Sequence, residues 1–63
     1  MSIQILGWKV KGETSLNGRT QVKELSRLYL AKEAAERFME LAKKERKWDK
    51  VWVSEVLGVD DLP

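Results

Sequence analysis

The dipeptide Asn17-Gly18 constrains the fold of this 63-residue chain more than any other feature. An Asn-Gly pair readily adopts the two positive backbone φ angles of a type I′ turn, and this turn matches the twist of two paired strands. If these two residues form the whole loop, the flanking segments pair as follows: Leu16 with Arg19, Glu13 with Val22, Lys11 with Glu24, Val10 with Leu25, Trp8 with Arg27, Leu6 with Tyr29 and Ile5 with Leu30. Apolar pairs, an opposite-charge pair and a Trp–Arg stack arise together in this register, so we predict a β-hairpin. A longer loop, or a bulge near Gly12, would shift the outer pairs.

The second half of this hairpin also fits a helical pattern. Val22, Leu25 and Leu28 recur at helical spacing, and Thr20 suits an N-cap, which would give one helix over residues 21–47. That helix would leave the Asn-Gly turn without a role and the first apolar segment without a partner strand. We therefore favour the strand and keep the long helix as the alternative.

The period changes to helical from Ala31 onward. One stripe of the expected helix is apolar and consists of Ala31, Ala34, Ala35, Phe38, Leu41 and Ala42, with Met39 beside it. Basic residues gather near its carboxyl end, where cations complement the negative end of the helix dipole. Beyond the helix, Lys50 to Val56 alternates in the manner of a third strand.

The predicted fold class is α+β, with the order strand, strand, helix, strand (ββαβ). The second and third strands are joined through a helix and should run parallel, with a right-handed crossover. The first strand fits between them, which gives a three-stranded antiparallel sheet in the order 2-1-3 with one helix on one face. We assign residues 1–57 to this single domain and residues 58–63 to a flexible tail.

A single helix leaves the other face of such a sheet open. Strand alternation predicts that the helix covers Ile3, Ile5, Gly7, Leu28, Leu30, Val51 and Val53. The opposite set contains Leu6, Val10 and Leu25 together with four candidate partner-binding residues, Trp8, Arg27, Tyr29 and Trp52. Aromatic residues and arginine dominate interface hot spots, so we predict a protein partner, most simply a second copy of the chain. In the alternative, the faces are exchanged: Trp8, Tyr29 and Trp52 lie beneath the helix, and Ile3, Ile5 and Leu28 are exposed.

Nucleic-acid binding is the second functional hypothesis. Its candidate residues surround Trp48 and are Lys43, Lys44, Arg46, Lys47 and Lys50. Basic side chains hold phosphates while aromatic side chains stack on bases. Glu45 and Asp49 interrupt the cluster, and the net charge is only +2, so the same run also suits a solvated helix end.

Composition argues against a catalytic role. The chain has no cysteine and no histidine, which excludes disulfides, thiolate metal sites and the side chain best suited to proton transfer near neutral pH. We predict no enzymatic activity, no cofactor, no metal site and no small-molecule substrate. Short apolar runs and the absence of a secretory signal indicate a cytoplasmic protein that does not enter a membrane. This size is typical of accessory proteins of phages and mobile elements, which act by binding other components.

Overall fold

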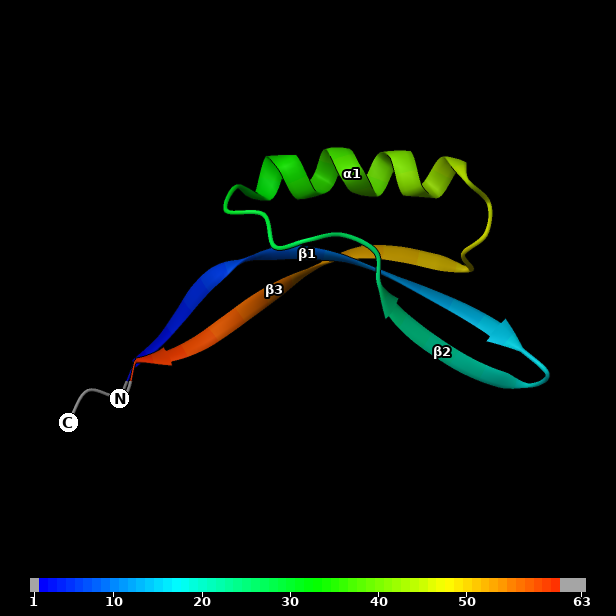
Figure 1. The fold of residues 1–63 in the computed structure, drawn as a ribbon, viewed down its shortest axis with the longest axis horizontal. Helices are drawn as coiled ribbons and strands as arrows, with labels where there is room; N and C mark the ends of the chain where they lie inside the picture. Colours follow the sequence, from blue (N-terminus) through cyan, green and yellow to red (C-terminus); the bar gives the residue numbers. More distant parts are fainter. Residues whose placement is uncertain (1, 61–63) are drawn as a thin grey trace.

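The computed structural model of the protein describes residues 2–60. Its elements are two strands, a helix and a third strand: β1 (Ser2–Leu16), β2 (Arg19–Glu24), α1 (Lys32–Lys44) and β3 (Lys50–Asp60). β1 lies between β2 and β3 and runs antiparallel to both, so these residues form one sheet in the order β2-β1-β3. The helix lies along one side of the sheet (Figure 1). The predicted α+β fold and its strand order are confirmed.

The turn between β1 and β2 has the predicted conformation. Asn17 and Gly18 have φ angles of 54° and 78°, so both occupy the left-handed region that a type I′ turn requires. The pairing next to the turn follows the prediction: Leu16 with Arg19, Glu13 with Val22 and Lys11 with Glu24. The alternative of one helix over residues 21–47 is wrong, because residues 19–24 are a strand and α1 begins at Lys32.

The predicted register fails beyond Leu25. The Leu25 N–H still donates to the Val10 carbonyl at 2.8 Å, but the Val10 N–H donates to the Ser26 hydroxyl at 2.9 Å. This hydroxyl replaces a backbone acceptor, so the chain leaves the ladder and rejoins it where Tyr29 pairs with Trp8. The predicted pairs of Trp8 with Arg27, Leu6 with Tyr29 and Ile5 with Leu30 are therefore wrong.

Leu6 forms a β-bulge in β1. The pairing of β1 with β3 shifts between Ile5, which faces Leu57, and Gly7, which faces Val56. One residue of β1 is thus left without a counterpart on β3. Since side chains alternate between the two faces of a strand, one extra residue reverses the alternation on either side of it.

The bulge overturns the predicted division of side chains between the faces. Ile5 lies on the same face as Val10, because their partners on β3, Leu57 and Val53, are an even number of residues apart in an unbroken strand. The prediction had placed Ile5 and Val10 on opposite faces. Ile3 likewise shares a face with Trp8, whereas the alternation expected from an uninterrupted strand separates them.

The helix covers the face that carries Val10. Tyr29 pairs with Trp8, which is two residues from Val10, and the Tyr29 ring lies 6.1 Å from the ring of Phe38 on α1. We call this face the helix side and the other the open face. The core between sheet and helix is small: among the described residues, the buried hydrophobic ones are Val10, Ala35 and Ala42, and Val10 is 0% exposed.

The third strand is longer than predicted. Residues 58–60 were assigned to a flexible tail, but the structure pairs Gly58 with Gln4, Val59 with Ile3 and Asp60 with Ser2. These residues pair with the start of β1. The composition of the predicted tail, with a glycine and two aspartates, did not indicate a strand. Residues 61–63 of the predicted tail lie outside the described residues.

Candidate protein interaction surface

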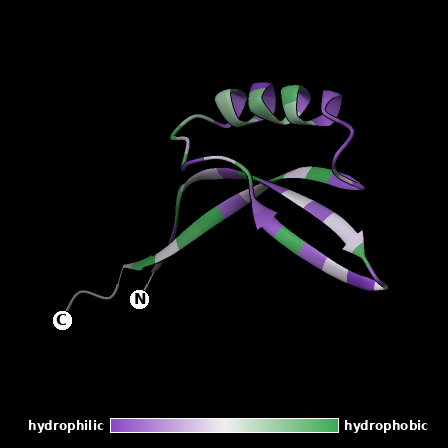
Figure 2. Ribbon diagram, turned by 45° about the vertical axis from the view of Figure 1, so that its right-hand side comes forward, coloured by the Kyte–Doolittle hydropathy of each residue, from purple (hydrophilic) through white to green (hydrophobic). Residues whose placement is uncertain are grey.

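Part of the sheet extends beyond the helix. Residues 2–7 of β1 and 56–60 of β3 form a two-stranded ribbon, which we call the arm, past the start of α1 (Figure 1). Its helix-side face carries four apolar side chains in two cross-strand pairs, namely Ile3 with Val59 and Ile5 with Leu57. All four are between 51% and 69% exposed. Hydrophobic segments of the arm stand out in Figure 2.

The protein exposes more surface than its length predicts for a folded monomer. A monomer of 63 residues should expose roughly 4,200 Å², whereas the solvent-accessible surface of this chain is 5172 Å², about 1,000 Å² more. The Cα radius of gyration is 14.0 Å, against roughly 11 Å for a compact chain of this length. The excess area matches what one partner buries in a standard protein–protein interface, about 800 Å².

The open face combines an apolar centre with exposed ion pairs. The Leu6 side chain packs over Gly58: a Cβ atom added to Gly58 would lie 2.8 Å from the Cδ1 atom of Leu6. Trp52 shares this face, because its partner Lys11 points away from the helix side. The ion pairs at its margin join Lys9 to Glu24 at 3.0 Å and Lys50 to Glu13 at 4.0 Å. Exposed pairs of this kind contribute about 0–1 kcal/mol each, so they add little stability to the chain.

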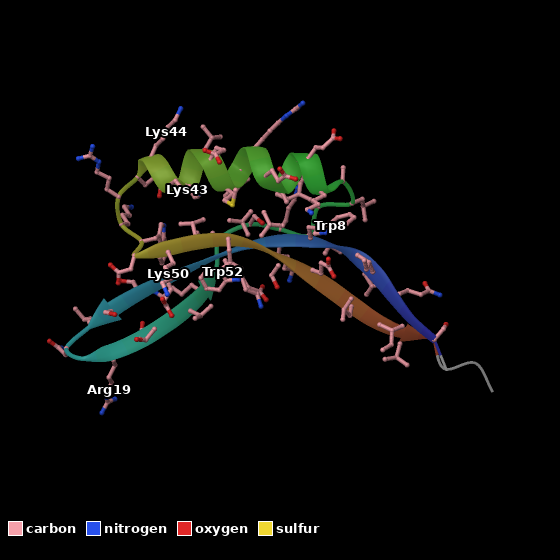
Figure 3. All side chains as sticks on the ribbon, turned by 180° about the vertical axis from the view of Figure 1, so that it is seen from behind. Trp8, Arg19, Lys43, Lys44, Lys50 and Trp52 are labelled. Carbon is pink, nitrogen blue, oxygen red and sulfur yellow. The ribbon has the colours of Figure 1, made fainter. Side chains whose placement is uncertain are left out.

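The four residues predicted to bind a partner do not share one face. Trp8 and Tyr29 lie on the helix side, and Trp52 lies on the open face (Figure 3). The Arg27 guanidinium carbon lies 5.6 Å from the centroid of the Tyr29 ring, in a cation–π arrangement. The prediction that all four lie on the open face is wrong because the helix covers the face that carries Trp8, and because Trp52 pairs with Lys11 and therefore lies on the other face. Contact with a partner stays a prediction for each of them.

Trp8 carries an unusual feature for a residue on the helix side. Its indole Nε1 is buried and has no hydrogen-bond partner within the described part of the chain. An unpartnered buried donor destabilises a fold by about 1–3 kcal/mol. The unsatisfied indole N–H thus reduces the stability that the small core provides.

The predicted basic cluster is only partly assembled. Lys43 and Lys50 meet at an open depression of about 670 Å³, and Trp48, Asp49, Val51 and Trp52 form the rest of its lining. Lys44 points away from the sheet (Figure 3). α1 ends at Lys44, and Arg46 has a φ of 56°, so Arg46 and Lys47 follow a turn rather than continuing the helical face. Lys43 is also 3.8 Å from Glu40, which offsets part of its charge.

Sequence reasoning did not find the arm. Ile3, Ile5, Leu57 and Val59 share an exposed face only because Leu6 bulges and β3 reaches Asp60. Gly7 was the local signal that could have located the bulge, because glycine in a strand interior often marks one. The only bulge considered from the sequence was one near Gly12, as an alternative to the regular register.

Comparison with protein-family models, with curated proteins and with solved structures found no match for this chain. No helix within residues 2–60 has both the length and the apolar character needed to cross a membrane. In the same part of the chain, no group of three or more His, Cys, Asp or Glu side chains is placed to hold a metal ion.

Proposed function

We propose that this protein is a small, non-enzymatic interaction module that associates with a second copy of itself through the exposed apolar part of its sheet. The observation that carries the proposal is the arm, whose helix-side face presents Ile3, Ile5, Leu57 and Val59 to solvent. Soluble monomers seldom expose a contiguous apolar surface of this kind. A second copy presents the same surface, so a two-fold arrangement covers both arms with one interface.

The energetics of the single chain support the same proposal. A core of this size supplies roughly 3–5 kcal/mol at most, and proteins this short often rely on staples or self-association. The chain has no cysteine for a disulfide. Burial of the arms at about 25 cal/mol per Å² of apolar area would add the stability that the helix and sheet lack.

Nucleic-acid binding is the second candidate, favoured by one observation. Lys43 and Lys50 share a depression with Trp48 and Trp52, so two cations and two large aromatic rings lie together. This combination suits a phosphate and a stacked base. Partial neutralisation of both lysines by Glu40 and Glu13 weakens this candidate relative to self-association.

Sedimentation velocity over a concentration series tests both candidates. We expect the unmodified protein to sediment as a dimer or larger species at micromolar concentration, and to dissociate only on strong dilution. A parallel series contains a single-stranded oligonucleotide at low and at moderate salt. Co-sedimentation that disappears as salt rises, with a monomeric protein throughout, would favour nucleic-acid binding and contradict self-association.

A further inference from the structure

The direction of the backbone groups of β3 follows from the contacts of β1. The backbone N–H and C=O groups of Trp8 bond to Tyr29, and those of Val10 bond to Ser26 and Leu25. The backbone groups of both residues therefore point away from β3. Successive residues of a strand point their backbone groups to opposite edges. The backbone N–H and C=O groups of Lys9 and Lys11 therefore point toward β3. The backbone groups of their β3 partners, Ser54 and Trp52, point back toward β1.

The intervening residues of β3 present their backbone groups to the outer edge of the sheet. These residues are Val51, Val53, Glu55, Leu57 and Val59. Within residues 2–60 no strand pairs with this edge, because β3 is the last strand of the sheet. Unpaired N–H and C=O groups along an exposed edge are a template for pairing with another chain.

Little in β3 guards this edge. Natural edge strands are protected by proline, by bulges, by shortness or by charged side chains, lysine above all. β3 is 11 residues long, has no proline and is not interrupted by a bulge, since the extra residue lies on β1. Its single lysine is its first residue, Lys50, its central charge is the one carboxylate of Glu55, and four of its residues are valines. The strand therefore suits pairing rather than exposure.

We propose that β3 pairs antiparallel with β3 of a second copy, with the two-fold axis passing at Ser54, so that the two sheets form one continuous sheet of six strands. This inference rests on the proposed self-association and names the surface that carries it. Both helices then lie on the same side of the joined sheet, because a two-fold axis perpendicular to a sheet keeps its faces. The continuous six-stranded sheet exists only in the dimer.

The side chains of β3 favour this centre over those at Glu55 and Val56. With the axis at Ser54, Trp52 faces Val56 of the partner subunit on the open face, an aromatic–aliphatic pair of the kind that stabilises sheets. A centre at Glu55 would place two glutamates directly opposite each other, which is destabilising. A centre at Val56 would bring Trp52 opposite residue 60, the end of the strand, and would lose the Trp52 pair.

The same register places each arm beside the covered half of the other copy. Val51 faces Leu57 of the partner subunit, and Val51 lies on the helix side of the sheet with Val53. The apolar face of one arm is thereby adjacent to the region that the helix of the other copy covers. The excess area of about 1,000 Å² per chain is comparable to the about 800 Å² per partner of a stable interface.

A cysteine substitution at the proposed axis tests this register, because the chain has no cysteine of its own. In the proposed dimer the two Ser54 residues form a non-hydrogen-bonded pair with Cα atoms about 4.5 Å apart, within the range of about 4.4–6.8 Å that a disulfide needs. Mild oxidation of Ser54→Cys should give a covalent dimer roughly tenfold or more faster than oxidation of Ser15→Cys, an exposed serine at the hairpin end. Val56→Cys should cross-link slowly, because its two copies lie roughly 13 Å apart along the strand.

Sedimentation of the reduced variants separates the outcomes. Rapid cross-linking of Ser54→Cys from a reduced protein that is dimeric supports the inference. Two results with dimeric reduced proteins would show that the β3 register is wrong while self-association stands. In the first, Val56→Cys cross-links faster than Ser15→Cys. In the second, neither Ser54→Cys nor Val56→Cys cross-links faster than Ser15→Cys. If the unmodified protein and the reduced variants are monomeric at every concentration, both the register and the proposed function are wrong.

Discussion

Replacing Ile5 by lysine should convert the protein into a monomer. Ile5 is half-exposed in the single chain, so a lysine fits without a clash, and its aliphatic stem still covers Leu57 across the strand pair. The proposed function has self-association cover the helix-side face of the arm, so the ammonium group would lose water there, and desolvating a charge costs several kcal/mol. We expect self-association to weaken roughly 100-fold or more, measured by sedimentation equilibrium.

Val22→Lys is the matched control for this substitution. Val22 has nearly the same exposure as Ile5 but lies on β2, on the hairpin that extends away from the arm. Association should be unchanged in this variant, and circular dichroism should show native secondary structure in both. Equal loss of association in the two variants would show that the effect comes from charge alone and not from the arm.

Replacing Gly7 by alanine should destabilise the fold strongly. A Cβ atom at this position would lie 2.5 Å from the Tyr29 carbonyl oxygen, which accepts the Trp8 N–H at 2.8 Å. The obstacle is backbone, so relief requires breaking the Trp8–Tyr29 bridge. Overpacking of this kind typically costs about 1–3 kcal/mol or more, a large share of the roughly 3–5 kcal/mol available to so small a core.

Gly58→Ala provides the comparison in urea denaturation. Its Cβ would also meet atoms at 2.8–3.0 Å, but these belong to the Leu6 side chain, which can rotate away. We expect the free energy of unfolding to fall by at least about 1 kcal/mol more in Gly7→Ala than in Gly58→Ala, because a side chain yields more easily than backbone. Similar losses would mean that the pairing of Trp8 with Tyr29 contributes little.

Local patterns determined the parts of this fold that could be predicted. Asn17-Gly18 located the turn and three cross-strand pairs because a two-residue loop leaves no freedom in register near it. The alanine-rich stripe predicted α1, and Ala35 and Ala42 are indeed its buried residues. The strand order followed from the connection between β2 and β3 through a helix, since antiparallel placement of β1 between them satisfies both connections.

The candidate interaction surface could not be predicted because two single residues alter the pattern. Ser26 replaces a backbone acceptor with its hydroxyl and ends the ladder of the hairpin. Leu6 adds one residue to β1 and puts Ile3 and Ile5 on the same face as Trp8 and Val10, which the prediction had placed on the opposite face. Each change is small in sequence, but side-chain alternation propagates it along the strand. The faces of the sheet therefore had to be observed, while the elements themselves could be inferred.

Amide hydrogen exchange along β3 tests most directly whether a second copy covers this edge. Ser54 points its N–H toward β1 and serves as the internal reference, while Val53 and Glu55 point theirs to the outer edge. We predict that the amides of Val53 and Glu55 are protected to a similar degree as that of Ser54 at high protein concentration, and that they lose this protection on dilution. Rapid exchange of Val53 and Glu55 at every concentration, beside a protected Ser54, would contradict the account.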